Sequence, residues 1–169
     1  MIYKIKIPLN TQVKISSNAI KITGPFGTII KKKSKNLNVY KKQNILYILD
    51  NLKDNLTLNL VNILKSLLIG VSKGYSKKLK IIGVEFKVNV KDNKLILRLG
   101  FSHEIIYTIP HNIQIYNPKS NILVITGYSN QIVSQIAAEI RNLKLPEPYK
   151  GKGILYFNEK YQQKEGKKT

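Results

Sequence analysis

Apolar and polar residues alternate along the first part of the chain. Between residues 13 and 49 the apolar positions recur every second residue, as at Ile20 and Ile22, and Asn, Gly and Pro separate the runs. A period of two is typical of strands that bury one face. Gly24-Pro25-Phe26-Gly27 is expected to be a turn between two strands, because proline presets φ and glycine accepts unusual backbone angles.

The period changes after residues 50–54, whose polar side chains could cap a helix. Apolar residues then recur three or four positions apart, at Leu56, Leu60, Ile63, Leu64, Leu67 and Val71. This spacing predicts a helix, and Gly70 and Gly74 are expected to weaken or end it. Residues 1–74 therefore predict a small sheet with one packed helix.

The same succession of elements returns after Gly74. Strand patterns occur at residues 79–82, 86–90, 95–99, 105–109, near 113 and at 122–126. Asp92-Asn93 is a candidate two-residue hairpin turn. A helix is expected next, since Ile132, Ile136 and Ile140 recur every four residues and Ala137 and Ala138 are small enough to lie close on a sheet. Residues 75–145 thus predict a second sheet-and-helix unit.

The two predicted units share sequence, which indicates an internal duplication. Ile7-Pro8, Asn10, Gln12 and Val13 recur as Ile109-Pro110, Asn112, Gln114 and Ile115, and Ser17-Asn18 and Ile22-Thr23-Gly24 recur as Ser120-Asn121 and Ile125-Thr126-Gly127. A chance likeness between two polar hairpins is the alternative, since the flanking strands are arranged differently. The predicted fold class is α+β, a tandem duplication of two small domains, each an antiparallel sheet with one packed helix.

Residues 146–169 depart from both patterns. The segment from Pro146 to Ile154 holds two prolines and two glycines in nine residues, a composition that excludes a regular helix or a central strand. Four lysines follow, Lys160, Lys164, Lys167 and Lys168. We expect an extended basic C-terminal arm, and we expect truncation after Leu145 to leave both domains folded.

The charge of the chain points to a polyanionic partner. Lys and Arg number 29 against 9 Asp and Glu, a formal net charge of +20, which repels itself unless something neutralises it. Nucleic acid is the predicted partner. An anionic membrane would need a basic amphipathic helix or about 18 consecutive apolar residues. The most apolar stretch, residues 56–71, is interrupted by polar side chains, so we expect a soluble chain with no membrane contact.

Two features of the composition narrow the kind of recognition. Arg98 and Arg141 are the only arginines, and the abundance of Lys, Asn and Ile is typical of AT-rich genomes, including those of organelles and some small bacteria. Lysine lacks the planar fork with which arginine reads guanine, so readout of a base sequence is disfavoured. The chain has no cysteine, which excludes disulfides, zinc ribbons and thiol nucleophiles.

The sequence predicts no catalytic, cofactor or metal site. His103 and His111 lack metal-ligand spacing with Glu104. Ser102-His103-Glu104 has the residue types of a triad, but neighbours on a strand point to opposite faces, and we expect a loop there. The glycines around Lys152 lack the context of a dinucleotide motif, and Gly24 to Gly27 joins strands where a KH loop joins helices.

The candidate RNA contacts fall into two groups. Lys73, Lys77, Lys78 and Lys80 cluster at the junction of the predicted units, and Arg141, Lys144, Lys150 and Lys152 run from the second helix into the arm. Tyr149 and Tyr156 could stack on bases or riboses, while Gly151 and Gly153 would let the backbone approach phosphates. A solvated charged face is the alternative, but the charge of the whole chain and the basic arm favour RNA.

The segment Pro146-Glu147-Pro148-Tyr149-Lys150-Gly151-Lys152-Gly153-Ile154 matches at every position the motif of the L-six family of large-subunit ribosomal proteins. The chain also resembles this family at residues 68–79, 82–84, 99–103 and 133–139. The resemblance implies two similar α+β domains on the large ribosomal subunit, among neighbouring ribosomal proteins and near the elongation-factor site. It also implies that the second domain and the arm lie against the sarcin–ricin region of the large-subunit rRNA. Ser102 and His103, in one matching segment, join the expected rRNA contacts.

The sequence departs from the family pattern at a few positions. Leu155 stands where arginine is usual, Leu143 and Leu145 interrupt a stretch often richer in arginine, and Glu85 replaces a usual glycine. Contacts made by those arginines in relatives are therefore in question for this chain.

Location and alternative functions complete the expectations. With no transit segment expected before Met1, we expect an organelle-encoded mitochondrial ribosomal protein, with a plastid or a bacterial cytoplasm as alternatives. An RNA-modifying enzyme would need an acid, a base or a cofactor loop in a pocket. A free-standing regulatory RNA-binding protein would bind an isolated transcript and would not co-sediment with large subunits.

Overall fold

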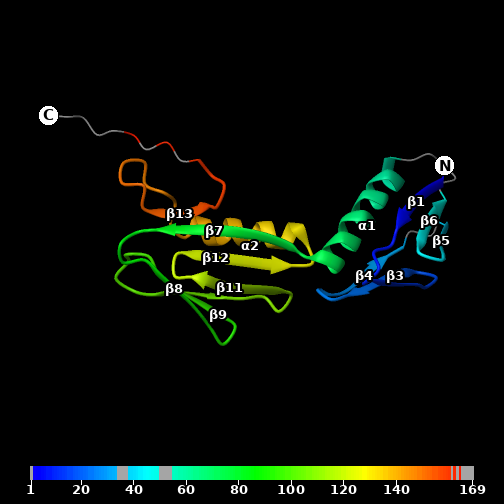
Figure 1. Ribbon diagram of the computed structural model, residues 1–169, viewed down its shortest axis with the longest axis horizontal. Helices are drawn as coiled ribbons and strands as arrows, with labels where there is room; N and C mark the ends of the chain where they lie inside the picture. Colours follow the sequence, from blue (N-terminus) through cyan, green and yellow to red (C-terminus); the bar gives the residue numbers. More distant parts are fainter. Residues whose placement is uncertain (1, 34–37, 50–54, 161, 163, 165–169) are drawn as a thin grey trace. The chain divides into compact units, whose positions relative to one another are not determined.

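The computed structural model describes residues 2–33, 38–49, 55–160, 162 and 164 (Figure 1). Its elements, in chain order, are β1 (Ile2–Lys6), β2 (Gln12–Ile15), β3 (Ala19–Gly24), β4 (Gly27–Lys32), β5 (Asn38–Lys42), β6 (Ile45–Leu49), α1 (Asn55–Lys73), β7 (Tyr75–Ile82), β8 (Lys87–Lys91), β9 (Lys94–Arg98), β10 (Ile105–Thr108), β11 (Ile113–Lys119), β12 (Ile122–Gly127), α2 (Asn130–Asn142) and β13 (Gly153–Tyr156). Contacts divide the chain into unit 1, residues 1–75 with 128–130, and unit 2, residues 76–127 with 131–169. No helix of the described ranges is long and apolar enough to cross a bilayer.

Unit 1 contains helix α1 and two three-stranded antiparallel sheets, in the strand orders β1-β6-β5 and β2-β3-β4. One face of each sheet supplies the core, because alternate residues of a strand point to the same side. Ile22, Leu46 and Ile48 are almost fully buried there together with Leu68 and Val71 of α1. The predicted turn is confirmed, since Pro25 and Phe26 join β3 to β4.

The buried stripe of helix α1 matches the predicted one only in part, at Leu64 and Val71. The buried positions among those described are Thr57, Val61, Leu64, Leu68, Gly70 and Val71. Of the predicted stripe, Leu60 and Leu67 are only partly buried and Ile63 is 40% exposed. Apolar residues occur on almost every side of this helix, so spacing alone left its orientation open. The expected cap at residues 50–54 lies outside the described residues.

The two glycines of α1 have different roles. Gly74 lies just past the helix with φ +75°, and its N–H donates to the carbonyl of Gly70 at 2.9 Å, which confirms the predicted end. Gly70 lies inside the helix, which continues to Lys73. A Cβ at Gly70 would meet the carbonyl oxygen of Tyr128 at 1.9 Å. Glycine is thus required at position 70 by a backbone contact.

Unit 2 contains helix α2, a three-stranded sheet β10-β9-β8 and a four-stranded sheet β11-β12-β7-β13. The helix buries Val133, Ile136, Ala137 and Ile140, so the predicted face is confirmed except at Ile132 and Ala138, which are half-buried. Asp92 and Asn93 have φ of 48° and 58°. Positive φ at both positions is the signature of the predicted two-residue hairpin turn.

The duplication is visible in equivalent local structure. The hairpin β2–β3 corresponds to β11–β12, and both are antiparallel. At the entry to each hairpin one N–H donates three residues back, from Thr11 to the carbonyl of Pro8 and from Ile113 to the carbonyl of Pro110, both at 3.1 Å. The sheets β1-β6-β5 and β10-β9-β8 also correspond, although β1 precedes its hairpin partners in the chain and β10 follows them. The different place of β1 and β10 in the chain explains why the sequence around the two matching hairpins is arranged differently.

Strand β13 was not expected from the sequence. Residues 153–156 pair antiparallel with β7, with Ile154 opposite Ile81 and Leu155 opposite Lys80. Ile154 is fully buried and Leu155 is 4% exposed. The prolines at 146 and 148 precede this strand, and an edge strand tolerates such neighbours where a central strand does not. Part of the predicted arm therefore belongs to the sheet, which reverses the expected result of truncation after Leu145.

Candidate nucleic-acid interface

The lysines of the described ranges have no carboxylate partners. Both ion pairs of the described residues are made by arginines, Arg98 with Glu104 and Arg141 with Glu159. Glu139 accepts a hydrogen bond from the Tyr107 hydroxyl at 2.6 Å. Burial, together with this carboxylate, raises the pKa of Tyr107 to about 12. No lysine of the described ranges pairs with a carboxylate, so the positive charge remains available to an external anion.

Several predicted contacts meet at the β7–β13 edge of unit 2. Lys80, Lys150, Gly151 and Tyr156 line a hollow of about 350 Å³, together with Ile82, Leu155, Phe157 and Glu159. Lys80 and Leu155 face each other across the two strands. Lysine ammonium groups beside apolar and aromatic side chains suit phosphates next to riboses or bases.

Lys78 lies at the same edge. The N–H of Phe157 donates to the carbonyl of Lys78 at 2.9 Å, and the Lys78 Nζ lies 5.9 Å from the centroid of the Phe157 ring. The Phe157 side chain is 52% exposed. Phe157 was missed in the sequence, because the four residues of β13 before it are too few for a strand pattern to be recognised.

A short closed loop presents Lys150 and Lys152 of the arm. The N–H of Glu147 donates to the carbonyl of Lys152 at 3.0 Å, and the N–H of Gly151 donates to the carbonyl of Glu147 at 2.9 Å. Tyr149, Lys150 and Lys152 are exposed on this loop. The arm is therefore a shaped surface between α2 and β13 over residues 146–152.

Gly151 and Gly153 serve the backbone of this loop. Gly151 has φ +63°, a conformation that favours glycine. Gly153 has φ +151° and is buried, and a Cβ there would lie 2.6 Å from the Cα of Pro146. Gly153 was expected to let the backbone approach phosphates, but the close contact that it makes is with the backbone of Pro146.

Arg141 ties the segment after β13 to helix α2. Its Nη2 and Nε donate to the Glu159 carboxylate at 2.6 and 3.2 Å, and its guanidinium lies 5.5 Å from the centroid of the Tyr156 ring. The Tyr156 N–H also donates to Glu159 at 3.0 Å. The hydrogen bond from Arg141 lowers the pKa of Glu159 below its ordinary value. The charge of Arg141 is therefore used within the fold.

Replacement of Glu159 by Gln is expected to destabilise unit 2 at neutral pH by about 1–2 kcal/mol, because it removes a charged hydrogen-bond acceptor from a half-buried pair. A carboxyl whose pKa is lowered by folding stabilises the fold above its unfolded pKa, and that contribution is lost as the pH falls through the folded pKa. The deficit of the variant should therefore shrink below about pH 4. Urea unfolding at pH 7 and pH 3 measures this, and an equal deficit at both values would contradict it.

The loop of residues 99–104 brings together further predicted contacts. The Lys144 Nζ lies 4.7 Å from the centroid of the Phe101 ring, and the rings of Phe101 and His103 are 6.4 Å apart. Phe101 is 43% exposed and was missed as a contact, although it lies in a segment that resembles the ribosomal family. A cation and exposed rings in one place form a surface suited to RNA.

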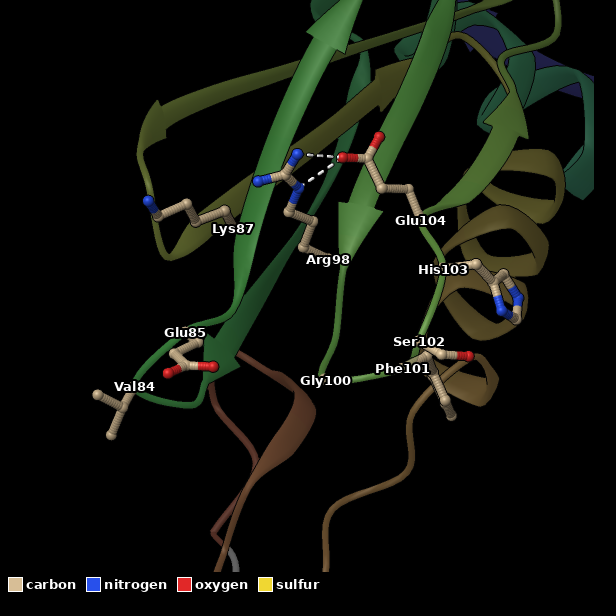
Figure 2. A pocket seen from close by; sticks show the side chains of 9 residues that line it. All are labelled: Val84, Glu85, Lys87, Arg98, Gly100, Phe101, Ser102, His103 and Glu104. Carbon is tan, nitrogen blue, oxygen red and sulfur yellow. Dashed lines mark hydrogen bonds and ion pairs between the residues drawn. The ribbon is translucent and has the colours of Figure 1, made fainter.

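The same loop borders a hollow of about 570 Å³, which Figure 2 shows with its nine lining side chains. Arg98 and Glu104 point toward each other there, while Phe101, Ser102 and His103 follow one another along the loop. The residues Ser102 to Glu104 form a loop, as predicted. Glu104 is directed to Arg98, which is unlike the relay of a catalytic triad.

Other predicted contacts stay outside these groups. Lys73 ends α1 and belongs to unit 1. Lys77 is exposed on β7 one residue before Lys78, on the opposite face of the strand. Among the described residues, no three His, Asp or Glu side chains gather as a metal site requires.

The duplicated α+β fold and the described lysines without carboxylate partners are those of a basic protein suited to a polyanionic partner. Residues 82–157 match the family described as "Ribosomal protein L6". The chain is 42% identical to the large ribosomal subunit protein uL6m of Reclinomonas americana, over 98% of this chain and 96% of that protein. It is 39% identical to uL6 of Alkaliphilus oremlandii, over 96% and 94%, and 39% identical to uL6 of Malacoplasma penetrans, over 96% and 92%. The chain belongs to the L6 family of ribosomal proteins, which are not enzymes.

Proposed function

We propose that this chain is a structural protein of the large ribosomal subunit and binds large-subunit rRNA. The observation that carries the proposal is the set of lysines without carboxylate partners around the β7–β13 edge and the loop of residues 146–152. A net charge of +20 requires a polyanion, and the names of the relatives supply its class.

Unit 2 is the proposed rRNA-binding part, and its target is the sarcin–ricin region near the elongation-factor site, beside other ribosomal proteins. Lys78, Lys80, Lys150 and Lys152 would contact phosphates there, and Lys144 would act with Phe101, Ser102 and His103. The match of residues 146–154 to the family motif supports this location. Arg141 would act indirectly, because its pair with Glu159 fixes the segment that carries the hollow.

The proposed mode of recognition is by RNA shape and phosphate position. Lysine makes point contacts to phosphate and cannot make the two-point contact that distinguishes guanine. Both arginines of the chain are engaged in ion pairs. Discrimination of the target should therefore rest on the arrangement of backbone phosphates.

Substitution of contacting lysines is expected to weaken binding and reduce its salt dependence. If about six phosphates are neutralised, log affinity should fall against log salt with a slope of roughly −4 to −5. Lys80→Ala, Lys150→Ala and Lys78→Ala should each flatten the slope by about one unit and weaken binding about five- to tenfold at 0.1 M salt. Fluorescence anisotropy with a folded rRNA fragment containing the sarcin–ricin region provides the measurement.

Lys119→Ala is the matched control. Lys119 is exposed at the end of β11, at the opposite edge of the same four-stranded sheet. Compensated base-pair swaps that preserve the fragment's fold should change affinity by less than about 1 kcal/mol, below the penalty of direct base readout. A slope that is equal for Lys80→Ala and Lys119→Ala, or swaps that abolish binding, would overturn the proposal.

A mitochondrial ribosome is the proposed location. The Lys-, Asn- and Ile-rich composition and the likeness to a protein named uL6m support it, although relatives named uL6 are nearly as similar. Mass spectrometry of gradient-purified mitochondrial large subunits from the source cells should detect the chain, and its recovery only in other ribosomes would contradict the proposal.

A further inference from the structure

Unit 1 has an exposed sheet face that the proposed rRNA contacts do not use. In the sheet β1-β6-β5 the inward residues, among them Ile5, Leu46 and Ile48, pack into the core with α1. The opposite face carries nine side chains, Ile2, Lys4 and Lys6 of β1, Ile45, Tyr47 and Leu49 of β6, and Asn38, Tyr40 and Lys42 of β5. We call these nine residues the outer face of unit 1.

Two tyrosines stack at the centre of the outer face. Tyr40 and Tyr47 are directly opposite each other in the antiparallel register, and their ring centroids are 5.1 Å apart with an angle of 4° between the rings. Lys4, paired with Tyr47 from the other neighbouring strand, has its Nζ 5.9 Å from the centroid of the Tyr47 ring. The three side chains form a row across the sheet, from Lys4 through Tyr47 to Tyr40.

The row ends at Tyr40, whose ring is partly exposed. β5 is an edge strand of its sheet, and Tyr40 is 43% exposed. Tyr47 covers one side of the Tyr40 ring, so the other side is where a further flat ring would continue the stack. Two parallel tyrosines that already stack give the added ring a fixed platform, which reduces the entropy lost on binding.

The charge of the outer face selects the ligand. Lys4, Lys6 and Lys42 are exposed, and none of the nine side chains is acidic. Lysines around exposed stacked aromatic rings on a β-sheet are the combination with which proteins hold single-stranded nucleic acid, because the rings stack on bases and the ammonium groups contact phosphates. A base within a duplex is already stacked on both sides, so only an unpaired base can use the Tyr40 ring.

The duplication provides an internal comparison. The sheet β10-β9-β8 of unit 2 has the same strand order, and Asn89 and Ile96 are opposite each other where Tyr40 and Tyr47 are in unit 1. Ile106 stands in the place of Lys4. The aromatic row is therefore specific to unit 1, because unit 2 has the same strand order without it.

We infer that the outer face of unit 1 is a second RNA-binding site, which takes an unpaired nucleotide of single-stranded RNA by stacking its base on Tyr40, with neighbouring phosphates at Lys4, Lys6 and Lys42. This site is separate from the proposed contacts of unit 2. It would let the chain hold a single-stranded segment independently of a folded rRNA region.

The test measures the full-length chain with two RNAs, an octauridylate that cannot pair and the folded sarcin–ricin fragment. Tyr40→Leu keeps an apolar strand residue but removes the aromatic ring, and we expect it to weaken octauridylate binding about tenfold. Tyr40→Phe should stay within about twofold of the original chain. Binding of the folded fragment should be unchanged by Tyr40→Leu and weakened by Lys80→Ala, so failure of this inference and failure of the proposed function give different results.

Asn89→Leu is the matched control at the equivalent position of unit 2 and should leave octauridylate binding unchanged. If Tyr40→Leu lowers the melting temperature, ultraviolet crosslinking of the unmodified chain to octauridylate should still attach uridine to a peptide that contains Tyr40 or Tyr47. Equal octauridylate affinities for Tyr40→Leu and the original chain, or crosslinks confined to unit 2, would overturn the inference and assign the outer face to a protein contact.

Discussion

Truncation after Leu145 is expected to unfold unit 2. The deletion removes β13, whose Ile154 is fully buried and whose Leu155 is 4% exposed. Loss of a buried aliphatic side chain of this size costs about 2–5 kcal/mol, and here two are lost together with the strand pairing to β7. A folded domain has only about 5–15 kcal/mol of stability in total. The combined loss is therefore comparable to the whole stability of the unit.

Hydrogen exchange followed by mass spectrometry distinguishes the two units. After the truncation, peptides from β8 to α2 should lose protection, while peptides from β1 to β4 should keep more of theirs. A truncation after Lys160 is the matched control, because it retains β13 and the Arg141–Glu159 pair. A chain truncated after Leu145 that keeps its protection in α2 would show that β13 contributes little to the fold.

The arm illustrates what could and could not be predicted from sequence. Its prolines and glycines correctly indicated an irregular segment, but only residues 146–152 are irregular, and Ile154 enters the sheet directly after Gly153. Four residues are too short for a periodic pattern to be recognised. Their partner, β7, is about 70 residues away in the sequence, and a pairing at such a distance is not encoded in local composition.

Local chemistry predicted two turns and the C-terminal end of α1. Asp92, Asn93 and Gly74 have the positive φ values expected of them, and Pro25-Phe26 forms the expected turn between β3 and β4, because the allowed φ values of a few residues decide such positions. The buried stripe of α1 could not be predicted in the same way. Its orientation depends on packing against sheets, and several of its sides are apolar enough to be buried.

The sequence indicated which residue types the candidate site contains, but it did not show which of them are neighbours in the fold. Lysines were expected at the RNA surface, and the described ones have no carboxylate partners. Arg141 was expected there on charge alone, but its partner Glu159 is 18 residues away and meets it only because β13 returns the chain to α2. The row of Lys4, Tyr47 and Tyr40 likewise exists only once three strands are placed in register.

Replacement of Gly70 by Ala is expected to destabilise unit 1, although helix propensity alone predicts the reverse. Alanine inside a helix is more favourable than glycine by about 1 kcal/mol. At this position, however, the added Cβ would lie 1.9 Å from the carbonyl oxygen of Tyr128 and 2.8 Å from the Tyr75 ring. A carbonyl oxygen cannot turn aside as a flexible side chain can, so the segment around Tyr128 must move away from α1.

The expected loss is about 2–4 kcal/mol, since overpacking costs typically 1–3 kcal/mol and a backbone shift would also disturb Tyr128, which packs on the core of unit 1. Asn62→Ala is the matched control, because Asn62 is exposed on the same helix and should gain a few tenths of a kcal/mol from propensity alone. Urea unfolding followed by circular dichroism measures both variants. The two mechanisms predict opposite signs for Gly70→Ala, so a gain in stability would mean that Tyr128 does not rest against the helix in solution.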